Sequence, residues 1–215
     1  YLIGVGYQLV NAARQDVGAE ASCDVLERMA AAHIKLCDGQ GAEMAWQETS
    51  PESISTLEAL QIYALKTSPA FEAALYAGLR MAGDVADYEE MIPKFSRHLG
   101  VGFQVLNDLK DWRGDKDNKL VHGQDTLAFR PTVLLALAFQ SADDEQRQEL
   151  RGLFDSEQPQ AERIDRIQQL FNTWGIIEQA EALVDKARER AESLADDVEP
   201  EALRRLLYFL VDTVL

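Results

Sequence analysis

The stretch GVGFQVLNDLKD, residues Gly100–Asp111, places one amide and two carboxylates at the end of a long apolar segment with helical periodicity. At about 100° per residue, Gln104, Asp108 and Asp111 fall within roughly 60° of one another on a helix. Asn107 flanks the same face. The buried face of a packed helix normally consists of residues such as leucine and alanine, and not of acids. The stretch therefore predicts a long packed helix whose polar end has a role beyond packing.

Asp108 and Asp111 alone leave two interpretations open. An Asp-x-x-Asp near a helix C-terminus is often a solvated helix end. Aspartates there oppose the helix macrodipole by roughly tenths of a kcal/mol each, so Lys110, Arg113 or a metal should compensate them. In the second interpretation, two carboxylates one turn apart beside an amide oxygen form half of a site for Mg²⁺. Water and phosphate oxygens would fill the other positions of the cation.

The composition is that of a globular protein with an acidic surface. The 215 residues fit one domain or two small ones, with 47% hydrophobic and 27% charged residues. The net charge of −16 argues against a nucleic acid or an anionic membrane surface as partner, because both require basic patches. An anionic substrate would need local lysines and arginines, or a metal, to overcome this charge.

Cysteine spacing and the absence of long apolar runs indicate the compartment. Cys23 and Cys37 lie in one expected helix, about 21 Å apart, which is too far for a disulfide. Free thiols fit a reducing cytosol. The sequence contains no signal peptide and no apolar run long enough to span a bilayer, so we expect a cytoplasmic protein without membrane insertion.

Nearly every segment has a period of 3.6 residues, and no strand-like alternation persists. Turn residues such as Gly39-Gln40-Gly41 separate the segments, and Ser68-Pro69 predicts a helix start with Ser68 as N-cap. The pattern predicts an all-α bundle with short connections. We expect helices near residues 1–14, 19–38, 53–67, 69–82, 88–112, 130–141, 144–154, 160–173, 176–195 and 200–214.

Three cations stand near predicted helix breaks. Lys66, followed by Thr67, precedes Ser68-Pro69; Lys119 lies in the polar stretch after the acidic helix end; Arg130 opens the next helix. Each cation alone is most simply a solvated helix end. Together with a metal-type acidic site in an acidic protein, they form the combination that a diphosphate group requires: Mg²⁺ on one side and basic side chains on the other.

At these residues the chain resembles the trans-type polyprenyl synthetases, the isoprenyl diphosphate synthases. Their second aspartate-rich motif, Gly-x-x-Phe-Gln-x-x-Asp-Asp-x-x-Asp, matches Gly100–Asp111, with Asn107 in place of the first aspartate. The family's Lys-Thr before a Phe-containing helix matches Lys66–Ala73. Three further matches are weaker. The family's Gly-Gln pair with an acid three residues later resembles Gly39-Gln40 with Glu43. Its Asp-x-x-x-Gly-Lys-x-Thr-Leu-Pro segment resembles Asp125–Leu134, and its Gly-x-x-Glu-x-Ala pattern resembles Gly175–Ala180.

The resemblance implies an all-α isoprenoid-synthase bundle around a central cavity. It also implies a homodimer and a Mg²⁺-dependent, head-to-tail condensation of an allylic diphosphate with isopentenyl diphosphate. Basic residues and Mg²⁺ would stabilise the departing diphosphate, while apolar helix faces keep water from the allylic cation. Carried over by residue, the roles are metal binding for Asn107, Asp108 and Asp111, catalysis for Lys66, Thr67 and Gln104, and substrate binding for Phe103, Lys119 and Arg130.

The chain departs from the family at its start. The first aspartate-rich motif of the family is not found in the sequence, and Tyr1-Leu2-Ile3-Gly4 resembles the helix that follows that motif. We therefore expect one polyprenyl-synthetase-like domain over residues 1–215 that lacks its N-terminal helices. We also expect a protein of these residues alone to be inactive.

Two alternatives remain open on the same fold. Asn107–Asp115 is half-way to the Asn/Asp-Asp-x-x-Ser/Thr-x-x-x-Glu motif of class I terpene cyclases, which convert one substrate into a cyclic product. The altered motifs also allow a non-catalytic regulatory subunit of a prenyltransferase. Phe103-Gln104, Lys66-Thr67 and the segment at Arg130 favour the synthase.

Overall fold

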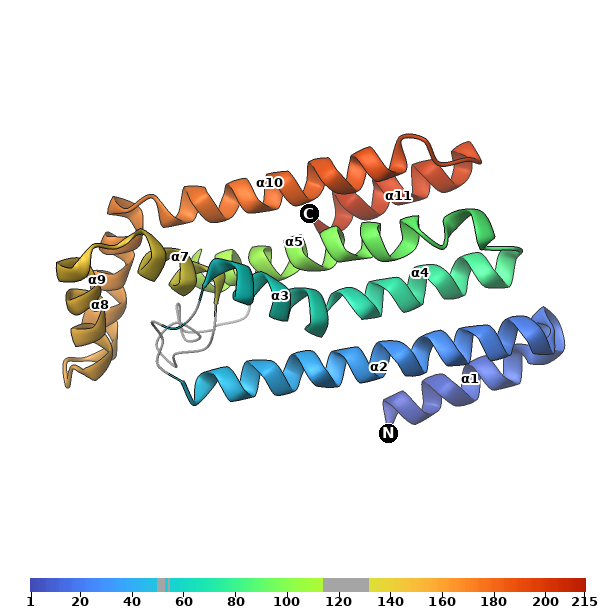
Figure 1. Ribbon diagram of the computed structural model, residues 1–215, viewed down its shortest axis with the longest axis horizontal. Coiled ribbons are helices and arrows are strands. Elements are labelled where there is room, and N and C mark those ends of the chain that lie inside the picture. The colour runs from blue at the N-terminus through green and yellow to red at the C-terminus, as the bar shows by residue number, and fades with distance from the viewer. Residues whose placement is uncertain (50–52, 54, 114–131) are drawn as a thin grey trace.

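A computed structural model describes residues 1–49, 53, 55–113 and 132–215 (Figure 1). All regular structure in these residues is helical, which confirms the predicted all-α class. The α-helices are α1 (Leu2–Val17), α2 (Ala19–Gln47), α3 (Thr56–Lys66), α4 (Ser68–Ala82), α5 (Met91–Arg113), α7 (Val133–Ser141), α8 (Asp144–Asp155), α9 (Gln160–Thr173), α10 (Ile176–Ala195) and α11 (Glu201–Val214), and a short 3-10 helix, η2, spans Ala86–Tyr88.

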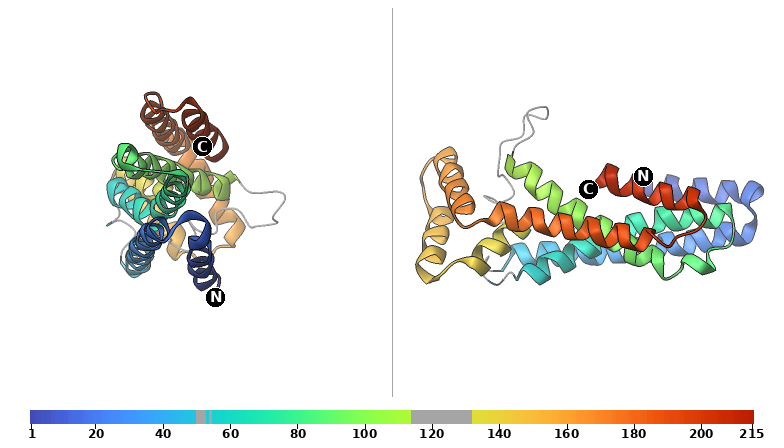
Figure 2. Two further views of the ribbon diagram at one scale, coloured as in Figure 1. Left: turned by 90° about the vertical axis from the view of Figure 1, so that its right-hand side faces the viewer. Right: turned by 90° about the horizontal axis from the view of Figure 1, so that it is seen from above.

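Four long stretches of helix run along the molecule. In Figure 1, α2, α4, α5 and α10 lie along the long axis in that order, and contacts join each to the next. The helix α3 leads into α4, and both contact α2. The helix α1 packs on α2, and α11 packs on α10. The α8–α9 pair lies at one end, as the right-hand view of Figure 2 also shows. The central helix α5 is therefore contacted by α3, α4, α7, α10 and α11.

Two large buried clusters hold α5 in place. Around its C-terminal half, Val105, Leu109 and Trp112 pack with buried residues of α7, and the centre of the Trp112 ring lies 4.8 Å from that of Phe171. Around its N-terminal half, Phe95 and Leu99 pack against buried residues of α10 and α11. Each such side chain stabilises the fold by about 1.5–3 kcal/mol. The polar residues near the C-terminus of α5 thus lie on a helix that is packed along its length.

The predicted break at Gly39-Gln40-Gly41 is wrong, because α2 continues through it to Gln47. The physical reason for glycine here is close approach. A Cβ atom on Gly39 would lie 2.5 Å from the backbone nitrogen of Lys66, whereas one on Gly41 would meet nothing within 4 Å. Gly39 lets α2 pack directly against the junction between α3 and α4.

The α3–α4 junction also differs from its prediction. Ser68 is not the N-cap but the first residue of α4; the N-cap is Thr67, and its side chain makes no capping hydrogen bond. The predicted proline in the first turn is confirmed. On the side opposite Gly39, a Cβ atom on Gly100 would lie 2.7 Å from the Cα atom of Ser68. Glycines of α2 and α5 thus enclose the junction from two sides.

The helix expected near residues 144–154 is present as α8, which Asp143 caps through a capping box with Gln146. Both cysteines are free, as expected, and they are exposed. The helix expected to start at residue 53 begins at Thr56, where Ser55 is the N-cap and Glu58 completes the capping box. Among the helices of the described residues, none has both the length and the apolar character needed to cross a membrane.

Candidate active site

The α3–α4 junction and α5 meet through two predicted site residues. Gln104 Nε2 donates a hydrogen bond of 2.7 Å to Thr67 Oγ1. Thr67 is only 8% exposed, so this bond satisfies a hydroxyl that has little access to water. The threonine that sequence reasoning placed beside a helix start therefore serves the contact with α5, and the structure brings both residues together.

Lys66, the residue before Thr67, is held by α2. Its Nζ lies 2.6 Å from Glu43 Oε1, and the two side chains are only 19% and 13% exposed. Gln40 Nε2 donates to the other carboxylate oxygen of Glu43 at 3.1 Å. The lysine ammonium also lies 5.5 Å from the ring centre of Tyr63, one turn earlier on α3. Lys66 is thus a partly buried cation in a fixed position.

Asp108 is fixed by two donors on one oxygen. Its Oδ2 accepts a hydrogen bond from the Tyr63 hydroxyl and another, of 3.0 Å, from the backbone N–H of Val133. The same N–H also donates to the Tyr63 oxygen at 2.9 Å. Val133 is the first residue of α7, where the helix dipole favours a negative charge. Burial, and then the charge of Asp108, hold the pKa of Tyr63 well above its ordinary range, so its hydroxyl stays protonated.

The end of α5 offers oxygen ligands of the kind that Mg²⁺ prefers. Asn107, Asp108 and Asp111 are all half-buried on its last turns. Within the part of the chain that the structure describes, no three His, Cys, Asp or Glu side chains are grouped closely enough to hold a metal by themselves. These residues therefore fit half of a Mg²⁺ site that phosphate oxygens and water would complete.

Arg113, one of the two cations considered as compensation for the acidic helix end, pairs instead with Glu181 of α10. Lys110, the other, is exposed. Among the described residues, the start of α7 and the Tyr63 hydroxyl both donate to Asp108.

An apolar groove of about 440 Å³ runs between α4, α5 and α11. It begins beside Phe71, whose ring makes an edge contact with that of Phe103 at 6.0 Å between centres. The buried Ser96 hydroxyl, which lines the groove, has no hydrogen-bond partner in the structure described. The lining residues are Phe71, Ala74, Leu75, Gly78, Leu79, Ala82, Phe95, Ser96, Leu99, Leu206 and Leu210. Phe103, which Phe71 contacts, precedes Gln104 in the sequence of α5.

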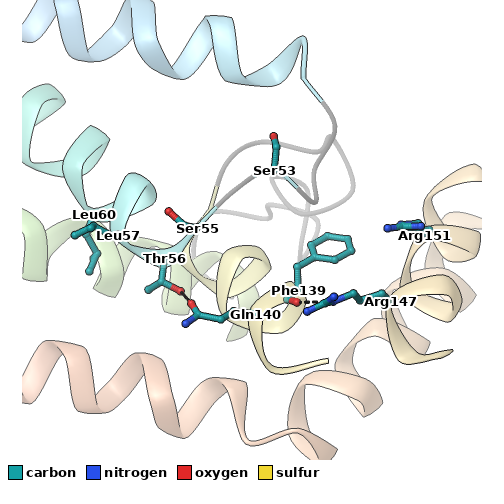
Figure 3. A pocket seen from close by; sticks show the side chains of 9 residues that line it. All are labelled: Ser53, Ser55, Thr56, Leu57, Leu60, Phe139, Gln140, Arg147 and Arg151. Carbon is teal, nitrogen blue, oxygen red and sulfur yellow. Dashed lines mark hydrogen bonds between the residues drawn. The ribbon is translucent and has the colours of Figure 1, made fainter. Parts of the chain in front are cut away.

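A larger pocket, of about 650 Å³, lies elsewhere, between α3, α7 and α8 (Figure 3). Thr56 Oγ1 donates to Gln140 Oε1 at 2.5 Å on one side of it, and Arg147 Nε donates to the Phe139 carbonyl at 3.0 Å on the other. None of the predicted site residues that the structure describes lines this pocket. The candidate site is therefore the convergence of α2, α3, α5 and α7, and not this pocket.

Two of the predicted residues, Lys119 and Arg130, lie outside the described residues. One residue of the site was missed by sequence reasoning, namely Tyr63. Its place one turn before Lys66 puts both side chains on the same side of α3, and that spacing was the only available signal. Its contact with Asp108 joins residues 45 positions apart, which no local pattern indicates.

This helical bundle, with its amide and carboxylates at a helix end beside a Lys-Thr junction, is the fold of the isoprenyl diphosphate synthases. The chain belongs to the polyprenyl synthetase family, because the model of the family described as Polyprenyl synthetase matches residues 1–172.

Individual relatives agree with this assignment. The chain is 27% identical, over 187 residues, to a short chain isoprenyl diphosphate synthase of Methanothermobacter thermautotrophicus, covering 83% of this chain and 55% of that protein. A polyprenyl synthetase structure from Streptomyces coelicolor superposes with a TM-score of 0.83 at 20% identity, over 97% of this chain and 63% of the other.

A geranylgeranyl pyrophosphate synthase from Corynebacterium glutamicum, complexed with isoprenyl diphosphate and magnesium, gives a TM-score of 0.78 at 24% identity. It is matched over 91% of this chain and 56% of its own length. The chain therefore spans less than two thirds of the length of each of these relatives, namely 55% of the Methanothermobacter protein and 63% of the Streptomyces protein. At these identities the two solved structures establish the shared fold.

Proposed function

We propose that this protein is an isoprenyl diphosphate synthase, a prenyltransferase that joins an allylic diphosphate to isopentenyl diphosphate head-to-tail with Mg²⁺. The observation that carries the proposal is the convergence of Lys66 and Thr67 at the α3–α4 junction with Gln104 and Asp108 of α5, through their mutual contact and through Tyr63. The relatives named as isoprenyl and polyprenyl diphosphate synthases support it and favour the synthase over the cyclase.

Each half of the site would act on the diphosphate leaving group. Mg²⁺, when bound by Asp108 and Asp111 with Asn107 as a weaker ligand, supplies Lewis-acid charge to the diphosphate oxygens. Lys66 binds a further oxygen, and its three N–H donors allow it to keep Glu43 at 2.6 Å while doing so. Gln104 and Thr67 fix each other's side chains next to the reacting carbon. Lys119 and Arg130 are proposed as further diphosphate-binding residues.

The apolar groove suits the hydrocarbon end of the substrate. Phe71, which contacts Phe103, lines the groove, and leucines of α4, α5 and α11 line it further along. An allylic cation formed near Gln104 would be shielded from water by these side chains. We expect the isoprenyl chain to extend from the Gln104–Thr67 contact into this groove.

The remaining expectations are proposals of the same kind. We propose that residues 1–215 form one polyprenyl-synthetase-like domain that acts as a homodimer in the cytoplasm. The two free, exposed cysteines support a reducing compartment.

The experiment is Mg²⁺-dependent binding of farnesyl thiodiphosphate, an unreactive allylic analogue, followed by calorimetry. We expect saturable binding that is lost with EDTA, is not reproduced by farnesol, and weakens about tenfold or more in Lys66→Ala. The matched control is Lys94→Ala, which removes an exposed lysine of α5 that pairs with Glu90. Equal binding with and without Mg²⁺, or by Lys66→Ala and wild type, would refute the proposal.

A further inference from the structure

Tyr63 contacts both halves of the candidate site, the acidic half at Asp108 and the basic half at Lys66. It is 1% exposed and is among the largest fully buried side chains of the structure. Its hydroxyl donates to Asp108 Oδ2 on α5 and accepts from the first N–H of α7, at Val133. Three helices therefore meet at one buried oxygen atom.

The hydrogen bonds around this oxygen form a closed triangle. Val133 N lies 2.9 Å from the Tyr63 hydroxyl and 3.0 Å from Asp108 Oδ2, while the hydroxyl donates to that same carboxylate oxygen. Two donors that approach one carboxylate oxygen from different helices restrict rotation of the Asp108 carboxyl group about its side-chain bonds. The direction in which Oδ1 points is consequently fixed by the fold.

The ring of Tyr63 faces the other half of the site. The Lys66 ammonium lies 5.5 Å from the ring centre, within the range of a cation–π interaction. Lys66 is also held at 2.6 Å by Glu43. One side chain thus contacts the acidic residue on the metal side and the cation on the diphosphate side.

A role in packing alone would not require the hydroxyl. Phenylalanine would fill the same space, keep the ring under Lys66 and avoid the burial of a hydroxyl beside a carboxylate, which is unfavourable unless both are satisfied. The geometry points to a positioning residue. We propose that the Tyr63 hydroxyl orients the Asp108 carboxylate toward the Mg²⁺–diphosphate complex, an inference that rests on the proposed function.

The test is Tyr63→Phe, which removes the hydroxyl and retains the ring. The matched control is Tyr88→Phe, since the Tyr88 hydroxyl makes a comparable hydrogen bond of 2.6 Å to the Glu199 carbonyl, between η2 and the α10–α11 turn. Both variants are first shown to be folded at the assay temperature by thermal unfolding. Binding of Mn²⁺ together with methylenediphosphonate is then measured from the loss of the free Mn²⁺ electron paramagnetic resonance signal.

We expect Tyr63→Phe to weaken Mn²⁺–diphosphonate binding about tenfold or more, as loss of an outer hydrogen-bond partner of a metal ligand does, and Tyr88→Phe to bind as wild type does. Wild-type affinity in Tyr63→Phe would overturn the positioning role while leaving the proposed function intact. A wild-type protein that binds no Mn²⁺–diphosphonate would overturn the proposed function, and this inference with it.

A second variant covers the case in which Tyr63→Phe does not fold. Val133→Pro removes the other donor to Asp108 Oδ2 at the first helical position, where proline is well tolerated. It should weaken Mn²⁺–diphosphonate binding in the same way. Loss of folding in both variants would mean that these hydrogen bonds serve the fold alone, and would overturn the inference.

Discussion

Lys66 Nζ lies 2.6 Å from Glu43 Oε1, and both side chains are more than four-fifths buried. Removing the lysine leaves a carboxylate with little water and no cation, so we expect Lys66→Met to lower the free energy of unfolding by about 2 kcal/mol. Lys94→Met, which breaks an exposed pair with Glu90 on α5, should change it by no more than about 0.5 kcal/mol. Urea denaturation measures both values, and equal effects of the two substitutions would contradict this account of the Lys66 pair.

The two glycines in the last part of α2 should respond oppositely to alanine. Gly39→Ala places a Cβ atom 2.5 Å from the Lys66 backbone, and we expect it to destabilise the protein by about 1–3 kcal/mol. Gly41→Ala meets nothing within 4 Å and should stabilise it by about 0.5–1 kcal/mol through helix propensity. Thermal unfolding of the two variants gives the signs directly. A stabilising Gly39→Ala would mean that α2 does not approach the α3–α4 junction as described.

His98 should make stability depend on pH in the weakly acidic range. Burial, followed by the positive charges of Arg190 and Arg97, lowers the pKa of His98 below its ordinary value of about 6.5. The folded state therefore binds fewer protons than the unfolded state between these two pKa values. The contribution of His98 is fully present above pH ~6.5 and is lost as pH falls through the folded pKa.

The comparison with His98→Gln isolates this effect from the titration of carboxylates. Urea denaturation of both proteins at a series of pH values from about 7.5 downward should show wild type losing stability more steeply than the variant below pH ~6.5. Parallel curves would show that His98 titrates normally in the folded protein.

The apolar groove should discriminate between prenyl chains by length. Ala74 lines it on α4, so Ala74→Phe would fill part of its volume of about 440 Å³. We expect the variant to lose affinity for a long-chain prenyl thiodiphosphate by about tenfold, with a smaller loss for dimethylallyl thiodiphosphate. Ala182→Phe, at an exposed position of α10, is the control. An equal loss for both ligands would place the hydrocarbon chain elsewhere.

Helix positions and the polar face of α5 could be predicted because both depend on local periodicity. Val105, Leu109 and Trp112 are buried as the 3.6-residue pattern of this segment requires. The same pattern predicts neighbouring positions for Gln104 and Asp108 on one face of α5. In the structure, Gln104 contacts Thr67 at the α3–α4 junction, and Asp108 contacts Tyr63 near the end of α3. Patterns that repeat within one helix are therefore reliable guides to what that helix presents.

Features that depend on a second helix could not be predicted. Glycine is a residue type typical of helix breaks, yet Gly39 lies within α2 and allows close contact with the backbone of Lys66, 27 positions later in the sequence. Threonine is a residue type typical of helix caps, yet the Thr67 hydroxyl accepts a hydrogen bond from Gln104. In both cases a tertiary contact decides between two roles that the local sequence allows equally.

The central claim is that Lys66 on one side and Asp111 on the other bind one Mg²⁺–diphosphate complex. The most direct measurement is calorimetric titration of methylenediphosphonate into wild type, Lys66→Met and Asp111→Asn, each with and without Mg²⁺. The account predicts Mg²⁺-dependent binding by wild type that weakens about tenfold or more in each variant. Binding by wild type that is independent of Mg²⁺, or that neither substitution changes, would contradict it.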